Sequence, residues 1–269
     1  MAIETTGTIL DKIVAARRVT VEHRKRVLPL VALRMAVEKG KPLPVRDFAA
    51  ALGRPGVSVI AEVKKASPSR GLLRADYVPD WLAQRLDLSG ASAISVLTEE
   101  EFFQGALEHL RLVRPVTSVP LLRKDFVFDP WQVWESRAAG ADSFLLIAAI
   151  LDEALLAELI SLGRTLGMEP LVEVHTRAEL DRALAAGAMI VGVNNRDLRD
   201  FSVRLETSIE LIEAIPEDRI AVTESGLRSS VEIARLAEAG FDAFLVGEQL
   251  MVAEDPGAAL RALLGREAN

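Results

Sequence analysis

The segment "AAGADSFL" (residues 138–145) shows the unit from which most of the chain is built. It joins the end of a helical stretch to the start of an apolar strand, with Gly140 between them. A glycine at this place readily takes the left-handed conformation that ends a helix. The same order recurs in "LSGASAIS" (88–95), "AAGAMIVG" (185–192) and "EAGFDAFL" (238–245). The chain therefore repeats a helix–turn–strand unit.

Short apolar runs rich in β-branched residues predict the strands of this repeat. They are "VSVIAEVK" (57–64), "SAISVLT" (92–98), "PLLRKDF" (120–126), "DSFLLIA" (142–148), "EPLVEV" (169–174), "MIVGVN" (189–194), "RIAVTES" (219–225) and "DAFLVG" (242–247). Strands that are apolar on both faces and separated by helices are typical of parallel β/α units. Eight such units over residues 57–265 predict a closed (β/α)8 TIM barrel. An open doubly wound sheet is the alternative, which is less favoured because the chain has no Gly-x-Gly-x-x-Gly turn.

Residues 1–56 do not follow the repeat. The segments "ILDKIVAARRVTVEHRKRV" (9–27), "PLVALRMAVEKG" (29–40) and "VRDFAAALG" (45–53) predict three helices. Nothing in this region indicates an independent domain. We therefore expect one domain over residues 1–269, with a helical extension (1–56) packed on the barrel.

Composition limits the class of protein. Half of the 269 residues are hydrophobic, and the formal net charge is −7 with both signs of charge present. This balance argues against a nucleic acid or an anionic membrane as partner. The absence of cysteine excludes disulfides and thiolate metal sites. No signal peptide or transmembrane stretch is apparent, so we expect a cytoplasmic protein, and we expect a monomer because no helix face is left apolar without a reason.

Polar residues gather at the ends of the predicted strands. In "VIAEVKKASPSRG" (59–71), Glu62 and Lys64 occupy alternate positions of a core strand and so share one face. In a TIM barrel the active site lies at the carboxyl ends of the strands. The polar and glycine residues at these ends are Glu62, Lys64, Ser67, Thr98, Lys124, Asp125, Glu173, His175, Asn194, Asn195, Arg196, Glu224, Ser225, Gly226, Gly247 and Glu248. The alternative to a catalytic site is a set of ion pairs that only closes the barrel, since buried charges need partners.

The last two strand ends indicate the kind of ligand. Ser225 and Gly226 precede a helix that starts near Ser229, and Gly247 lets the backbone approach a ligand closely. Amides after the seventh and eighth strands form a phosphate site in many TIM barrels. A small phosphorylated substrate is therefore favoured.

The histidines and tryptophans give weaker signals. We expect His23 and His109 on the surface and His175 at the start of a loop. Trp131 and Trp134 have helical spacing, which predicts packing against the core. No cluster of His, Asp and Glu has the spacing of metal ligands, so no metal is expected.

The chain resembles the indole-3-glycerol phosphate synthase family of tryptophan biosynthesis. The resemblance runs from about residue 8 to residue 262, in family order. It rests most on "VIAEVKKASPSRGLL" (59–73) and "RKDF" (123–126), with "SVLTEEEFFQGALEHL" (95–110), "VGVNNRDL" (191–198), "TESGL" (223–227) and "LVGEQLM" (245–251) in support. A helical extension before the barrel is also a family feature.

The resemblance implies a ring closure without cofactor or metal. The substrate would be 1-(2-carboxyphenylamino)-1-deoxyribulose 5-phosphate, and the products indole-3-glycerol phosphate, carbon dioxide and water. By matching position, Lys124 would be the general acid and Glu173 a base or second acid. Lys64 would contact the anionic groups of the substrate and would share the acid role. Glu62 and Asn194 would orient the sugar hydroxyls and the lysines, and Glu224 would be a positioning residue.

The resemblance also implies the binding residues. Arg196 and Ser67 would hold substrate anions. The backbone amides offered to the phosphate would be those of Ser225, Gly226, Gly247 and Glu248. The walls of the pocket for the aromatic ring would be Phe103, Phe126 and Leu145–Ile147, because flat apolar surfaces suit an aromatic ligand.

The general acid role raises a question of charge. A lysine that acts as an acid near neutral pH needs a lowered pKa, which burial and the charge of Lys64 would favour and a nearby glutamate would oppose. We therefore expect the Lys124 pKa to be lowered, against the opposing effect of a nearby glutamate. Two alternatives to the synthase stay open, namely another phosphosugar barrel such as phosphoribosylanthranilate isomerase and a non-catalytic phosphosugar-binding barrel.

Overall fold

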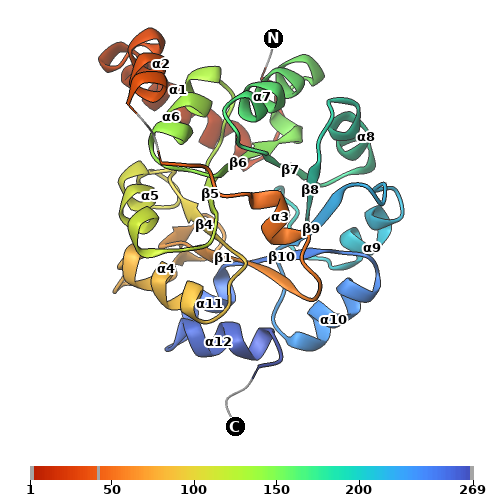
Figure 1. Ribbon diagram of the computed structural model, residues 1–269. Helices are drawn as coiled ribbons and strands as arrows, with labels where there is room; N and C mark the ends of the chain where they lie inside the picture. The colour runs from red at the N-terminus through yellow and green to blue at the C-terminus, as the bar shows by residue number, and fades with distance from the viewer. Residues whose placement is uncertain (1–2, 41–42, 267–269) are drawn as a thin grey trace.

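Eight parallel strands close into a barrel in the computed structural model, which describes residues 3–40 and 43–266 (Figure 1). The ring runs β1-β10-β9-β8-β7-β6-β5-β4. It closes because β1 pairs with β10 (Ser58 with Ala243) and with β4 (Ile60 with Ala93). The bounds are β1 Ser58–Val63, β4 Ala93–Leu97, β5 Leu121–Lys124, β6 Ser143–Ile147, β7 Leu171–Val174, β8 Ile190–Asn194, β9 Ile220–Glu224 and β10 Ala243–Val246. The predicted TIM barrel is confirmed, and the open sheet is excluded.

A ring of helices covers the outside of the barrel (Figure 1). These helices are α4 Pro79–Leu88, α5 Leu107–Val113, α6 Pro130–Ala138, α7 Glu153–Thr165, α8 Arg177–Ala185, α9 Glu206–Ile212, α10 Ser230–Glu238 and α12 Pro256–Leu263, with a short α11 Glu248–Val252 after β10. The predicted left-handed glycines are all observed, with φ of +100°, +90°, +90° and +113° at Gly90, Gly140, Gly187 and Gly240. The repeated glycine therefore ends each of these helices as the sequence indicates.

A hairpin of two short strands, each two residues long, follows β1 and was not expected. The run from Val59 breaks after Val63, and β2 (Ala66–Ser67) pairs antiparallel with β3 (Gly71–Leu72). Pro68 and the left-handed Gly71 (φ +67°) fit this tight reversal. The hairpin holds Ser67 over the end of the barrel from which the site is built.

Three helices precede the barrel, α1 Ile9–Val27, α2 Leu30–Lys39 and α3 Phe48–Leu52. Helix α3 lies over the barrel end from which the strands start (Figure 1), and it buries Phe48 and Leu52. Helix α1 packs at the opposite end of the barrel, where Ile9, Leu10 and Ile13 line the cavity described below. The helices of the extension therefore pack against both ends of the barrel.

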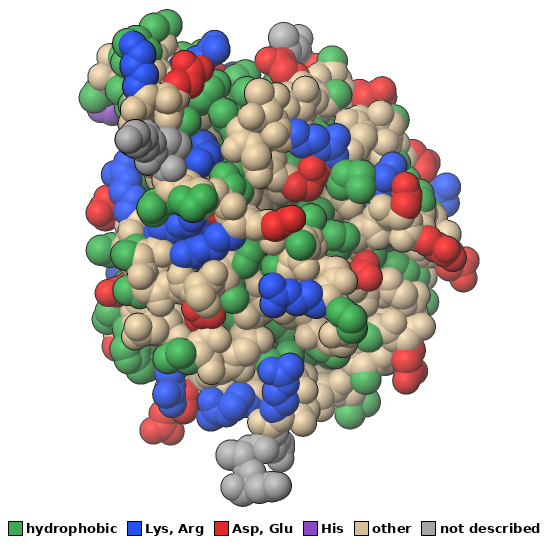
Figure 2. All heavy atoms as spheres, viewed as in Figure 1, with side chains coloured by type: hydrophobic (Ala, Val, Ile, Leu, Met, Phe, Trp, Pro, Cys, Tyr) green, Lys and Arg blue, Asp and Glu red, His purple; other side chains and the backbone are tan. Residues whose placement is uncertain are grey.

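The side chains outside the site bear on the other expectations. Basic and acidic side chains are interspersed on the face shown in Figure 2. Trp131 is buried, as predicted, and its indole N–H donates to the carbonyl of Leu28 at 2.8 Å. His23 is exposed, but the prediction for His109 is wrong, since its ring is half-buried against Tyr77 with centroids 5.3 Å apart. None of the helices in the described part of the chain combines the length and the apolar run that a membrane crossing needs.

Candidate active site

One cavity lies at the carboxyl ends of the strands and gathers most of the residues predicted there, while Thr98, His175 and Asn195 do not line it. Catalytic, substrate-binding and phosphate-binding candidates from Glu62 to Glu248 all line it. Their strands follow one another around the ring in chain order, and closure of the barrel brings the carboxyl ends of all of them to one end. The positions of these residues are therefore as predicted, while their roles stay predictions.

Sequence reasoning missed part of the cavity wall. The additional lining residues with apolar side chains include Ile9, Leu10 and Ile13 of α1 and Leu198, Phe201 and Val203 of the loop after β8. The first three form a helical stripe in the sequence, but a stripe does not say which end of the barrel it covers. The loop after β8 carries no periodic pattern that could have placed it.

Lys124 stands between carboxylates from two other strands. Its Nζ lies 2.9 Å from Oε2 of Glu173 on β7 and 2.5 Å from Oε2 of Glu224 on β9. The side chains of Lys124, Glu173 and Glu224 are 13%, 5% and 2% exposed, so water screens these contacts little. The arrangement fixes the ammonium at the centre of the strand ends.

The prediction of a lowered Lys124 pKa is wrong. Burial does lower the pKa, but the charges of Glu173, Glu224 and Glu62 together outweigh burial and raise the pKa above its usual range. The sequence showed the lysines but could not show how many carboxylates face Lys124. The side chain is thus a full ammonium ion in the free protein, ready to donate to an oxygen that gains negative charge.

The two carboxylates that share Lys124 differ in proton affinity. Burial acts to raise the pKa of each, but for Glu173 the charges of Lys124 and His175 lower it to about 2. For Glu224, burial together with the charges of Glu173 and Glu62 raises the pKa to about 7. The pair titrates as one coupled unit, because two carboxylates so close together resist carrying full charge at once. Near neutral pH, Glu173 is therefore the base of the pair and Glu224 the proton holder.

This difference predicts how stability depends on pH. The pKa of Glu224 rises from 4.5 in the unfolded chain to about 7, so the folded protein binds the extra proton between these values. The stability that this proton contributes is present below about pH 4.5 and is lost as pH rises through 7. Replacing Glu224 by Gln removes the titration, so the Tm of Glu224→Gln relative to the parent should increase from pH 5 to pH 8. Calorimetry gives the two Tm values. A Tm difference between Glu224→Gln and the parent that stays level or decreases from pH 5 to pH 8 would contradict the raised pKa of Glu224.

Glu62 and Lys64 form a second ion pair in the cavity. Nζ of Lys64 lies 2.6 Å from Oε1 of Glu62, whose side chain is 4% exposed. Gly247 is needed here for a reason that the sequence did not show, because a Cβ at this position would overlap the carboxylate of Glu62. The glycine at the end of β10 thus makes room for an acidic side chain of the site.

Gly192 on β8 makes room for the side chain of Glu224, and nothing in the sequence indicated this role. A Cβ at Gly192 would overlap Oε1 of Glu224, which is buried and has no hydrogen-bond partner among the described residues. We expect Gly192→Ala to displace the Glu224 carboxylate from Lys124 and to lower kcat by about tenfold or more, since small displacements at a reacting centre are costly. Gly53→Ala is the control, because its added methyl would meet nothing closer than 3.6 Å. Equal kcat for the two variants would show that the position of Glu224 is unimportant.

The predicted phosphate region is a bend of unusual backbone after β9. Ser225 and Gly226 both have positive φ (69° and 85°), which is costly for a serine and marks a constrained turn. Ser229 caps α10 and Glu232 completes the capping box, so that helix start is satisfied within the chain. The Glu248 carboxylate lies 3.1 Å from Nε of Arg70 and 3.4 Å from Nη2 of Arg196. The bend, Arg196 and Glu248 all line the active-site cavity.

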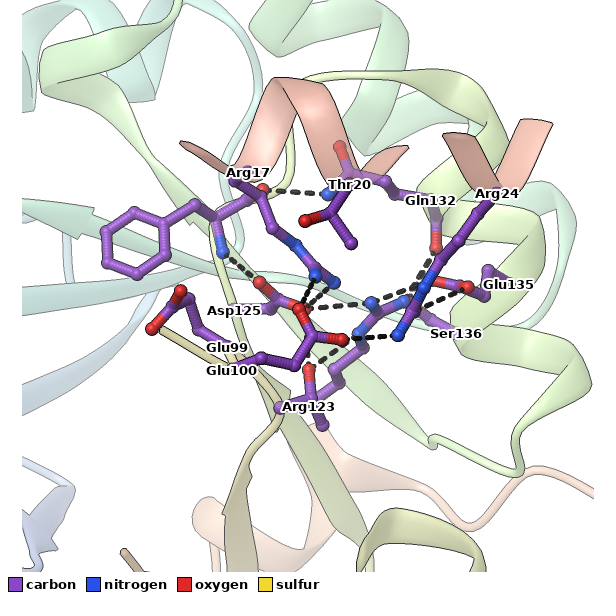
Figure 3. Close-up of polar contacts among 12 residues, drawn as sticks. Arg17, Thr20, Arg24, Glu99, Glu100, Arg123, Asp125, Gln132, Glu135 and Ser136 are labelled. Atoms are coloured by element: carbon purple, nitrogen blue, oxygen red, sulfur yellow. Dashed lines mark hydrogen bonds and ion pairs between the residues drawn. The ribbon is translucent and has the colours of Figure 1, made fainter. Parts of the chain in front are cut away.

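A buried ion network holds the strand that carries Lys124 (Figure 3). Asp125, the next residue, binds Arg17 of α1 at 2.6 Å and Arg123 at 2.8 Å, and it accepts from Thr98 at 2.6 Å. Arg123 also binds Glu135 of α6 at 2.8 Å. Each charge has a partner, as buried charges require. The network ties α1 to the end of β5 and explains why Thr98 and Asp125 end their strands.

Two further candidates at strand ends have structural contacts. Asn195 donates to the hydroxyl of Thr223 at 2.9 Å and to the carbonyl of Glu224 at 3.0 Å. His175 begins the turn after β7, as predicted, and its Nε2 lies 3.5 Å from Oε1 of Glu173. Within residues 3–40 and 43–266, no group of three or more acidic or histidine side chains is arranged to hold a metal ion.

Comparisons with known proteins give a consistent result. A family model described as indole-3-glycerol phosphate synthase matches residues 10–263. An indole-3-glycerol phosphate synthase of Polaromonas sp. is 47% identical over 263 residues, covering 96% of this chain and 98% of the relative. One from Pelodictyon phaeoclathratiforme is 50% identical over 228 residues, covering 84% and 89%.

Solved structures show a wider likeness in fold. The thiamine phosphate pyrophosphorylase of Pyrococcus furiosus matches 80% of this chain and 96% of its own, with a TM-score of 0.59 and 18% identity. The 3-hexulose-6-phosphate synthase of Salmonella typhimurium matches 78% and 97%, with a TM-score of 0.60 and 14% identity. At these identities the likeness concerns the barrel alone.

Proposed function

The chain belongs to the indole-3-glycerol phosphate synthase family, and we propose that Lys124 and Glu173 are the acid and base of its ring closure. The activity is that of a carboxy-lyase in tryptophan biosynthesis. The substrate is the carboxyphenylamino-deoxyribulose phosphate, and a small phosphorylated ligand suits the cavity. The single observation that carries the proposal is the position of Lys124 between Glu173 and Glu224, with all three side chains lining that cavity.

The first step needs an acid. The ring carbon that bears the carboxylate attacks the ketone carbon, and the ketone oxygen gains negative charge. Lys124 donates its proton to this oxygen, and the raised pKa of the ammonium keeps it charged until that moment. Loss of carbon dioxide then returns the electron pair to the aromatic ring.

The second step needs an acid and a base. The new hydroxyl leaves as water after it gains a proton, and the methylene next to the nitrogen loses one. Glu173 takes the methylene proton, because its lowered pKa leaves it ionised at neutral pH. It hands that proton to Lys124, 2.9 Å away. Lys64 contacts the substrate carboxylate and shares in the protonation of the leaving hydroxyl.

Other residues position the substrate. Glu62 holds Lys64 at 2.6 Å, and Asn194 and Glu62 orient the sugar hydroxyls. Phe103 and Phe126, with ring centroids 6.0 Å apart, enclose the aromatic ring on one side. Leu145 and Ile147, which also line the cavity, provide further apolar wall for the ring.

The phosphate lies at the far end of the cavity from the aromatic ring. It accepts hydrogen bonds from the backbone amides of Ser225, Gly226, Gly247 and Glu248. Arg196 and Ser67 hold substrate anions, and Arg196 exchanges its contact with Glu248 for the substrate.

The activity is tested directly with purified protein and the carboxyphenylamino-deoxyribulose phosphate. We expect the fluorescence of the indole product to appear and one equivalent of carbon dioxide to be released for each indole formed. A folded protein that binds this substrate without forming indole would overturn the proposal and favour a non-catalytic barrel. We further propose that the protein acts in the cytoplasm as a monomer, for which light scattering of the eluted protein gives the mass.

A further inference from the structure

The reaction consumes a proton that the cavity must obtain from solvent. The substrate carboxylate carries a negative charge at neutral pH and leaves as neutral carbon dioxide. Two protons are needed, one on the ketone oxygen and one on the leaving hydroxyl, while only one is recovered from the methylene. After each turnover, the group of acids around Lys124 is therefore one proton short.

We propose that His175 is a positioning and relay residue that returns this proton to Glu173 and Lys124 from a second cavity. The inference rests on the roles proposed above for Lys124 and Glu173. Its basis is geometric, since His175 lines the second cavity and its two ring nitrogens face Glu173, which lines the active-site cavity, and Glu179, which lines the second.

The contacts of His175 connect Glu179 on one side with Glu173 and Lys124 on the other. Its Nδ1 lies 3.2 Å from Oε2 of Glu179 in the first turn of α8, and its Nε2 lies 3.5 Å from Oε1 of Glu173. The other oxygen of Glu173, Oε2, lies 2.9 Å from Nζ of Lys124. A proton can thus pass from Glu179 to His175, then to Glu173, and after rotation of that carboxyl to Lys124.

The Nε2 atom of His175 is otherwise unused. It is buried and has no hydrogen-bond partner within residues 3–40 and 43–266. An unsatisfied buried nitrogen is unfavourable and needs a reason. The backbone N–H of His175 donates to the same Glu179 oxygen at 2.7 Å, which fixes the ring with Nε2 directed at the catalytic carboxylate.

The second cavity is the side from which the proton would enter the path from solvent. It is lined by His175, Glu179 and Arg182 together with the loop after β8. It adjoins the active-site cavity, because Leu10, Asn194, Arg196 and Leu198 line both. The charged groups around His175 or along the second cavity are Glu4, Glu173, Glu179, Arg182, Arg196, Asp197, Arg199, Arg204, Glu210 and Glu224.

The charges make the histidine suitable as a proton carrier. Burial lowers its pKa, but the hydrogen bond to Glu179 and the charges of Glu173, Glu179 and Glu224 outweigh burial and raise the pKa above its usual value. The raised pKa favours the protonated ring, the form that can give a proton to Glu173.

The test compares a single turnover with steady-state turnover in His175→Asn. The resting enzyme already holds the protons for one reaction, so with enzyme in excess the rate of indole formation should stay within about twofold of the parent. Repeated turnover requires recharging, so kcat should fall about tenfold or more, and added imidazole buffer should restore part of it. His109→Asn is the matched control and should change neither rate, since this half-buried histidine packs on Tyr77 outside both cavities.

The outcomes separate the relay from the proposed function. Equal loss of both rates in His175→Asn would indicate a merely structural role, and unchanged kcat would exclude the relay. If His175→Asn does not fold, Glu179→Gln interrupts the same path one step earlier and should give the same split. Lys124→Met in the same assay is the reference, because a normal first turnover by that variant would overturn the proposed acid and not the relay.

Discussion

Replacing Lys124 by methionine should lower kcat by about 10³- to 10⁴-fold, the largest effect expected for any single change in the cavity. This corresponds to about 4–5.5 kcal/mol of lost transition-state stabilisation. The physical reason is that both the proton for the ketone oxygen and the partner of two buried carboxylates are removed. The measurement is the rate of indole formation with saturating substrate.

The substrate affinity should change much less than kcat. The groups proposed to hold the phosphate and the aromatic ring are separate from Lys124, so the Kd by calorimetry should stay within about an order of magnitude. Lys65→Met is the matched control, because Lys65 follows Lys64 in the chain but lies outside the residues that line the cavity. A Lys124→Met enzyme that keeps a tenth or more of the parent kcat would rule out Lys124 as the acid.

Replacing Glu173 by glutamine should lower kcat by about 10²- to 10³-fold. Glutamine keeps the shape of the side chain and can still contact Lys124, but it cannot take the methylene proton. The intermediate that has lost carbon dioxide but not water should therefore accumulate, and rapid quenching followed by mass spectrometry should detect it. The loss should be smaller than for Lys124→Met, because the first step retains its acid.

Glu169→Gln is the control for this change. Glu169 lies just before the start of β7, whereas Glu173 lies near the carboxyl end of that strand. Glu169 pairs with Arg164 at the surface, at 2.7 Å. Its replacement should leave kcat within about twofold of the parent. If Glu173→Gln slows carbon dioxide release as much as indole formation, then Glu173 acts in the first step and its assignment as the base of dehydration is wrong.

The barrel could be predicted from the sequence because each unit carries its own local signals. Each of the eight barrel strands lies inside its predicted range, and the left-handed glycine of Gly140 and its equivalents ends the helices as expected. The candidate site could be predicted because barrel closure leaves only one place for the strand ends, so Glu62, Lys124 and Glu173 had to meet.

Properties that depend on distances between strands could not be predicted. The direction of the Lys124 pKa shift depends on how many carboxylates face the ammonium, and the sequence gives no count of neighbours across the barrel. Gly192 appeared to be an ordinary strand residue until its contact with Glu224 was visible. The contribution of Ile9 and Ile13 to the cavity wall likewise depends on where the N-terminal extension packs on the barrel. A helical pattern in the sequence does not show this position.

The most direct test of the central claim is the structure of the protein with the substrate whose ketone has been reduced to an alcohol. This compound keeps the phosphate, the aromatic ring and the oxygen of interest, but it cannot close the ring. The account predicts the alcohol oxygen within hydrogen-bond distance of Nζ of Lys124. It also predicts the phosphate at the amides of Ser225, Gly226, Gly247 and Glu248, and the ring against Phe103 and Phe126. An alcohol oxygen held by Lys64 and remote from Lys124, or a substrate bound in the reverse direction, would contradict the account.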